Sequence, residues 1–121
     1  MNIDDIREYY LTFPYVTECF PFGDDILVFK VGSKIFGLSV LECDEPFVQL
    51  KCNPDRAIDL REHYEGVEPA WHMNKAHWNK VYLNRDLRQE QVRELVAHSY
   101  ELVWSKLSKA EKQSLQETIR T

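Results

Sequence analysis

The residues best equipped for chemistry lie in one short stretch, PAWHMNKAHWNKVYL, at positions 69–83. It contains two tryptophans, two histidines, two asparagines and two lysines. Such side chains could ligate a metal, assist a nucleophile, or hold an anionic polymer by placing cations on phosphates and rings on bases. These three kinds of site demand different residue spacings, so the sequence can be tested against each.

A metal site is not favoured by the spacing of the histidines. His72 and His77 are five positions apart, which places them on opposite faces of a strand or about 140° apart on a helix. No HxxxH or CxxC pattern supports them, and the acidic run Asp4, Asp5 and Glu8 is typical of a solvated helix face. We expect no tight zinc or iron site and no cofactor.

An enzyme with a catalytic nucleophile is not favoured by the sequence either. Cys52, beside Lys51 and followed by His63, is the best-placed cysteine, but a free cysteine is usually just buried. The chain has no GxSxG motif, no phosphate-binding glycine loop and no dinucleotide-binding fingerprint, and it contains only 4 glycines. The sequence therefore predicts a non-enzymatic protein.

Nucleic-acid binding is favoured by how the charge is distributed. The net charge of -5 disfavours an anionic partner, but residues 71–93 form a locally basic block. Its cations are interleaved with Trp71, Trp78 and Tyr82, and Asn74 and Asn79 could add hydrogen bonds. The predicted phosphate contacts are Lys75, Lys80, Arg85 and Arg88. Tryptophan and tyrosine beside lysine also describe a protein-binding surface, so a protein-interaction or chaperone-like adaptor module remains the alternative.

The elements that must position these residues follow from periodicity and turn chemistry. Asn2 caps a helix that ends at Pro14, and strands at 26–31 and 34–41 form a hairpin around Gly32-Ser33. A third strand covers 47–52. Asn53-Pro54 starts a helix that stops at Gly66.

Two short strands, at 70–73 and 77–83, then carry the stretch itself. Alternation along the second predicts that Trp78, Lys80 and Tyr82 lie on the more open face and His77 and Asn79 on the other. Asp86 and Gln89 resemble a capping box that opens a long helix to Leu107, and Ser108 and Glu111 open a short terminal helix. The order predicts an α+β fold with an antiparallel sheet of about five strands and helices packed on one face.

Composition places the chain among single-domain globular proteins. Its 121 residues fit one domain, and 44% are hydrophobic. The odd number of cysteines, the acidic N-terminus and the lack of a long apolar run predict a cytoplasmic protein that neither carries a secretory signal nor enters a membrane. We expect a monomer.

Four segments together resemble the MmcQ/YjbR family of small bacterial proteins: KIFGL, VQLKCNP, LREHYEGVEPAWHMNKAHWNKVYL and HSYELVWSKL. The likeness covers roughly residues 26–109, and HMNKAHW is its most specific part. Members are named as DNA-binding proteins with a fold similar to the frataxin-like and secretion-chaperone-like α/β sandwiches, in which wing-like hairpins are thought to hold DNA. The resemblance thus implies DNA as partner.

The resemblance also implies which residues form the site. The residues that match the sequence pattern of the family are Lys51, His72, Asn74, Lys75, His77 and Trp78. This chain departs from many relatives where they have a glycine-containing turn and a helix-opening proline, since Arg85 and Arg88 stand there. The full predicted nucleic-acid-binding set adds Trp71, Lys80, Tyr82, Arg85 and Arg88.

Overall fold

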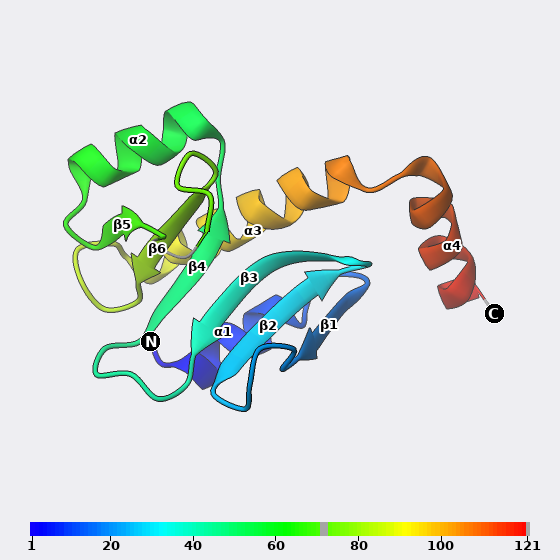
Figure 1. Cartoon of the computed structure of the whole chain (residues 1–121), viewed down its shortest axis with the longest axis horizontal. Helices are drawn as coiled ribbons and strands as arrows, with labels where there is room; N and C mark the ends of the chain where they lie inside the picture. Colours follow the sequence, from blue (N-terminus) through cyan, green and yellow to red (C-terminus); the bar gives the residue numbers. More distant parts are fainter. Residues whose placement is uncertain (71–72, 121) are drawn as a thin grey trace.

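The computed structural model describes residues 1–70 and 73–120, and Figure 1 shows their arrangement. Trp71 and His72 lie outside the described residues. Four helices occur in this part of the chain: α1 (Ile3–Tyr10), α2 (Pro54–His63), α3 (Gln89–Lys106) and α4 (Lys109–Arg120). The strands are β1 (Val16–Cys19), β2 (Ile26–Val31), β3 (Lys34–Val40), β4 (Phe47–Lys51), β5 (Val67–Pro69) and β6 (Trp78–Tyr82).

The strands form a single sheet in the described residues, in the order β1-β2-β3-β4-β6-β5 with every neighbouring pair antiparallel. The predicted α+β class is confirmed, but the sheet has six strands because β1 was not predicted. α1 ends at Tyr10, and Tyr15, with φ 65°, lies just before β1. β5 ends at Pro69, and of the strand expected at 70–73 neither Ala70 nor Met73 is in a strand, while residues 71 and 72 lie outside the described residues.

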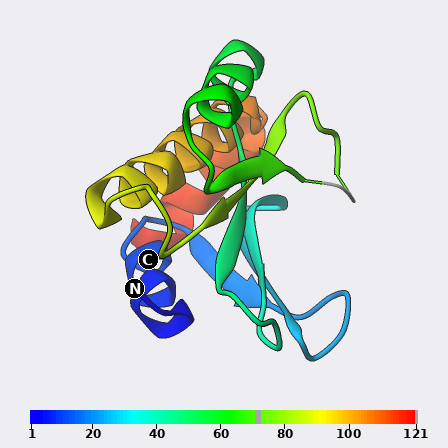
Figure 2. The ribbon, with the colours of Figure 1, turned by 90° about the vertical axis from the view of Figure 1, so that its left-hand side faces the viewer.

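All of the helices that contact the sheet lie on one face of it. Figure 2 views the sheet close to edge-on, with α1 and α3 on one side and two loop segments projecting on the other. Apolar side chains of the covered face fill the core, among them Tyr10, Phe29, Phe36, Leu50 and Val96. The opposite face, which we call the open face, therefore carries the residues that no helix covers.

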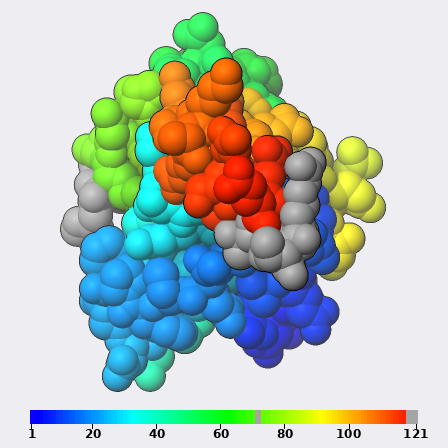
Figure 3. Space-filling model, turned by 90° about the vertical axis from the view of Figure 1, so that its right-hand side faces the viewer, coloured from blue at the N-terminus to red at the C-terminus, as the bar shows by residue number. Residues whose placement is uncertain are grey.

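α4 packs at one end of the sheet against the turn between β2 and β3. Glu111 accepts hydrogen bonds from the backbone N and Oγ of Ser33, at 2.7 and 2.9 Å. A Cβ built on Gly32, whose φ is 58°, would approach both Glu111 and Leu115. Figure 3 shows α4 seated against this part of the chain. The predicted Gly32-Ser33 turn is confirmed, and it serves as the docking point of the last helix.

Three of the four predicted helix starts are confirmed. Asn2 and Asp5 form a capping box, Asn53 accepts from the backbone N of Asp55, and Ser108 Oγ accepts from the backbone N of Glu111. The start predicted at Asp86 is wrong. α3 begins at Gln89 after Arg88, whose backbone N donates to the Gln91 side chain.

Asp86 instead fixes the turn that leads into β5. Its carboxylate oxygens accept hydrogen bonds from the backbone N–H groups of Glu65 and Gly66, at 2.9 and 2.8 Å. Slight burial raises the pKa of Asp86, but the backbone hydrogen bonds and the charge of Arg85 together outweigh this effect, and the pKa lies below its ordinary value. The Asp86 carboxylate thus bridges two segments 20 residues apart.

Asp86→Ala is expected to lower the free energy of unfolding at neutral pH by about 1–2 kcal/mol, because two backbone donors lose their acceptor. The folded-state pKa is below the unfolded value of about 3.9. The contribution is therefore present above about pH 4 and is lost as the pH falls through the folded-state pKa. Urea unfolding of both proteins across this range should show the difference shrinking in acid, and a pH-independent difference would contradict the account.

Among the described residues, no helix is both long enough and apolar enough to span a membrane.

Candidate nucleic-acid interface

β4 and β6 lie side by side and place three cross-strand pairs on the open face. The pairs are Phe47 with Tyr82, Gln49 with Lys80, and Lys51 with Trp78. The predicted alternation of β6 is confirmed, since Trp78 and Lys80 are half-buried while Asn79 and Val81 are buried on the other face. Tyr82 shares the open face but is only 9% exposed, so little of its ring is accessible.

Lys51, at the end of β4, lies close to two lysines that the sequence analysis did not single out. Lys34 begins β3, and its Nζ donates to the backbone oxygen of Lys106 at the end of α3 (3.3 Å). The pKa of Lys51 is lowered, first by partial burial and then by the positive charges of Lys106 and Lys34. We call Lys34, Lys51 and Lys106 the lysine cluster. Because like charges repel, a bound anion would relieve its internal repulsion.

Trp78 lies at the same end of the sheet as the lysine cluster. It is the register partner of Lys51, and the backbone N of Cys52 donates to the backbone oxygen of His77 (2.7 Å). The structure thus brings Lys51, His77 and Trp78 together as the predicted site requires. His77 is half-buried, and its backbone lies in this contact between the strands.

The turn before β6 is shaped by Asn74. Its Oδ1 accepts from the backbone N of Ala76 (3.0 Å), and its backbone oxygen accepts from the N of His77 (3.0 Å). Lys75, between them, is exposed. Asn74 therefore has a structural role in the turn, and the turn holds Lys75 at the surface beside β6.

Lys80 and Arg85 lie in a second group near the start of β4. Lys80 Nζ lies 4.2 Å from the centre of the Phe47 ring, and the Arg85 guanidinium lies 3.7 Å from that of Tyr82. Arg85 also forms two hydrogen bonds with Glu45, at 2.6 and 2.9 Å. This contact is the main cause that lowers the pKa of Glu45, and the charge of Lys80 lowers it further. The two cations thus already face a carboxylate and aromatic rings.

Two further polar residues lie apart from these groups. Arg88 is exposed at the start of α3. Asn79 is 2% exposed, and its Nδ2 donates to the backbone oxygen of Ala57 (3.3 Å) on the helical face. The prediction that Asn79 could reach a ligand is wrong, because β6 turns it into the interior.

An apolar groove of about 360 Å³ crosses the open face. Its floor comes from β2, β3 and β4, and its two rims are Phe22, in the loop before β2, and Met73, in the segment that leads into β6. These are the two segments that project from the sheet in Figure 2. The lining residues are Phe22, Ile26, Ile35, Leu38, Val40, Gln49 and Met73. The groove was not predicted from the sequence, although Phe22 and the apolar residues of the β2–β3 hairpin supply most of its lining.

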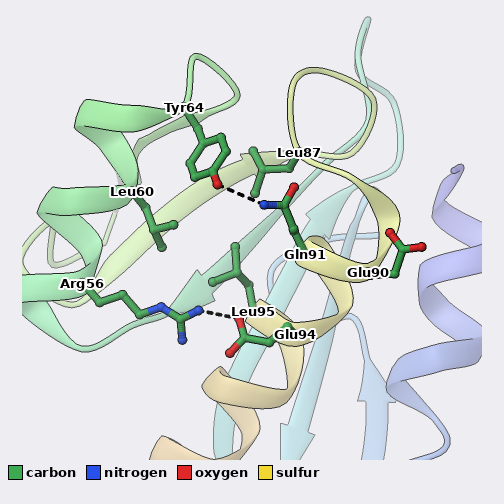
Figure 4. Close-up of a pocket in the computed structure, with 8 residues that line it drawn as sticks. All are labelled: Arg56, Leu60, Tyr64, Leu87, Glu90, Gln91, Glu94 and Leu95. Atoms are coloured by element: carbon green, nitrogen blue, oxygen red, sulfur yellow. Dashed lines mark hydrogen bonds and ion pairs between the residues drawn. The ribbon is translucent and has the colours of Figure 1, made fainter.

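A second hollow of about 220 Å³ lies between α2 and α3 and is shown in Figure 4. Four of its polar side chains are bonded in pairs. Tyr64 Oη accepts from Gln91 Nε2 (3.0 Å), and Arg56 forms an ion pair with Glu94 (2.5 Å). Side chains that satisfy one another in this way serve mainly to join the two helices.

The remaining reactive-looking residues have structural surroundings. Burial raises the pKa of the Cys52 thiol, which disfavours the nucleophilic thiolate. His63 Nδ1 lies 2.8 Å from the backbone oxygen of Asp59. His98 Nε2 accepts from the backbone N of Asn53 (3.2 Å), and burial lowers its pKa. Within the described residues, no group of three or more His, Cys, Asp or Glu side chains is arranged to hold a metal ion.

Comparison with known families places this fold and site in context. A family model described as YjbR matches residues 11–102, which include all six strands and most of α3. The chain belongs to the YjbR family. Family relatives include Escherichia coli O157:H7 YbdF, 38% identical over 99 residues, covering 82% of this chain and 81% of the relative. YjbR of Escherichia coli K12 is 32% identical over 101 residues, covering 84% and 86%. Both relatives are described as uncharacterised.

Solved structures of similar proteins share the architecture. The Deinococcus radiodurans protein DR2400, described with a DUF419 domain, superposes with a TM-score of 0.88 at 36% identity, over 95% of this chain and 88% of that one. A Pseudomonas syringae protein superposes with a TM-score of 0.73 at 27% identity, over 84% and 98%. The resemblance predicted from the sequence motifs is confirmed at the level of the family.

Proposed function

We propose that the chain is a non-enzymatic nucleic-acid-binding protein that holds phosphates at the lysine cluster and contacts a base or sugar with Trp78. One observation carries the proposal. Lys51 is partly buried, and the charges that shift its pKa are those of two other lysines, Lys34 and Lys106, which both lower it. Such an arrangement is electrostatically unfavourable alone and becomes favourable when an anion binds.

The proposal assigns different roles to the predicted cations. Lys51 lies in the cluster with Lys34 and Lys106, and Lys75 lies on the neighbouring turn. Lys80 and Arg85 face Glu45 and aromatic rings, so a phosphate would have to compete with these contacts. We therefore place the phosphate anchors at the cluster and leave Lys80 and Arg85 out of them.

Salt dependence tests the proposal. Three phosphate contacts predict that the logarithm of affinity falls with the logarithm of salt concentration with a slope of about -2.7 for duplex DNA or about -2.1 for a single strand. Fluorescence anisotropy with labelled DNA at several salt concentrations measures the slope. Arg85→Ala should leave it unchanged, whereas Lys51→Ala should reduce its size by about 0.7–0.9. Absence of binding to both duplex and single strand at low salt would refute the proposal.

A protein-interaction module using the same face is the second candidate. The observation that favours it is the apolar groove, because a contiguous exposed apolar surface often marks a protein contact. Phe22 is 60% exposed at its rim and would be an anchor. A pull-down with wild-type protein and Phe22→Ala, using nuclease-treated lysate, tests this candidate, and it fails if the two proteins capture the same set.

We also propose a cytoplasmic, monomeric protein. The three cysteines support the location, because Cys19, Cys43 and Cys52 are free thiols and a reducing compartment keeps thiols in this state. The likeness to frataxins stays a prediction.

A further inference from the structure

The apolar groove shares one face of the sheet with Lys51 and Lys30. Gln49, on the groove floor, precedes Lys51 by two positions on β4, so both side chains have the same orientation. Ile35, also on the floor, is the register partner of Lys30 on β2. Both lysines are half-buried. Cations therefore border the groove on two of its strands, at the end nearest the lysine cluster.

The other end of the groove has the opposite charge. Asp24 and Asp25 follow Phe22 in the loop before β2, and Glu42 follows β3 closely; all three are exposed. An anionic ligand would be repelled there and attracted to the lysine end. A nucleic-acid strand would therefore keep its phosphates at the lysine end, and only an uncharged part, such as a base, would extend along the groove towards Phe22.

We infer that the groove takes an unpaired nucleobase, so that the ligand of the proposed interface is single-stranded nucleic acid. The inference rests on the proposed function. In a duplex the faces of the bases are stacked on one another. Its phosphates could contact the lysines, but the apolar floor of the groove would stay exposed to water. A single strand can make both kinds of contact. The face of an unpaired base can pack on the apolar floor and on the exposed Phe22 ring, and a neighbouring phosphate can bind Lys51.

The dimensions of the groove agree with this ligand. At about 360 Å³ it lies in the size range of pockets that accept small molecules. Gln49 places an amide, with both donors and an acceptor, on an otherwise apolar floor, where it can pair with the edge of a base. A groove of this size accepts a base and excludes a double helix.

The test compares a labelled oligothymidine single strand with a duplex of equal length, using wild-type protein, Phe22→Ala and Phe20→Ala. Phe20 is a matched control, since it lies in the same loop, is 46% exposed and does not line the groove. We expect the wild type to bind the single strand more tightly than the duplex. Phe22→Ala should weaken single-strand binding by about tenfold or more without changing the salt slope, because a stacking contact releases no counterions.

The outcomes separate this inference from the function on which it rests. The inference would be overturned if the protein bound the duplex as tightly as the single strand or more tightly, and if Phe22→Ala and Phe20→Ala had the same affinity for the single strand. The proposed function would then still stand. No binding to either nucleic acid would overturn both. Loss of protein capture from nuclease-treated lysate in Phe22→Ala, with no loss of single-strand binding, would assign the groove to a protein partner instead.

Discussion

Gly37→Ala is expected to destabilise the protein by about 1–3 kcal/mol, and the expected cause is a collision with Tyr10. A Cβ at position 37 would lie 2.6 Å from Tyr10 Cε1 and closer still to its hydroxyl. The Tyr10 ring is fully buried and stacks on Phe29 with a centroid distance of 3.9 Å and an interplanar angle of 6°. It also meets the Phe36 ring edge-on. The ring is enclosed on several sides and cannot move away without disturbing the core.

Urea or thermal unfolding measures the effect, and Tyr10→Phe supplies the control. The Tyr10 hydroxyl is buried without a hydrogen-bond partner in the structure, so its removal should be neutral or slightly stabilising. Added to Gly37→Ala, it should recover part of the loss, because the closest atom of the collision is then gone. Equal stability of wild type and Gly37→Ala would show that α1 does not pack on β3 as described.

The double variant Lys34→Ala and Lys51→Ala is expected to lower nucleic-acid affinity by at least about a hundredfold at low salt. Each lost charge-assisted phosphate contact costs about 1.5 kcal/mol or more, and every 1.4 kcal/mol is a factor of ten. The loss should be the same for every base sequence, since phosphate contacts carry no base information. Anisotropy titrations with several oligonucleotides measure it.

The matched control removes the same charge from helix positions outside the lysine cluster. Arg61, on α2, and Arg93, on α3, serve this purpose when both are replaced by alanine. If binding depended on net charge alone, the two double variants would weaken it equally. Equal losses would therefore contradict a localised site at the lysine cluster, provided that both variants unfold at the wild-type midpoint.

Local patterns in the sequence were sufficient to predict most elements of the fold. The caps at Asn2 and Asn53, the Gly32-Ser33 turn and the apolar stripe of α3 each depend on residues a few positions apart. β1 was not predicted because VTEC has only four residues, which is too short for a clear alternation of apolar and polar side chains. Its strand conformation depends on pairing with β2. Asp86 was misassigned because its true partners, Glu65 and Gly66, are distant in the chain.

The candidate site was predictable only in part, for the same reason. Trp78 was selected by residue type and by resemblance, and Lys51 by resemblance alone; the register of β4 and β6 places them together. Lys34 and Lys106 join Lys51 only through the sheet and the end of α3, which no spacing rule reveals. Arg85 looked available in the sequence, but Glu45, 40 positions away, pairs with it.

The most direct test of a nucleic-acid site on the open face is a titration followed by two-dimensional amide NMR. On adding oligothymidine, the amide signals of Gln49, Lys51 and Trp78 are predicted to shift most, because these residues lie between the groove and the lysine cluster. Signals from α2 (Pro54–His63) should stay in place, since this helix lies on the covered side. The assignment of the ligand to this face would be contradicted if the largest shifts fell on α2, or if no signal shifted at low salt.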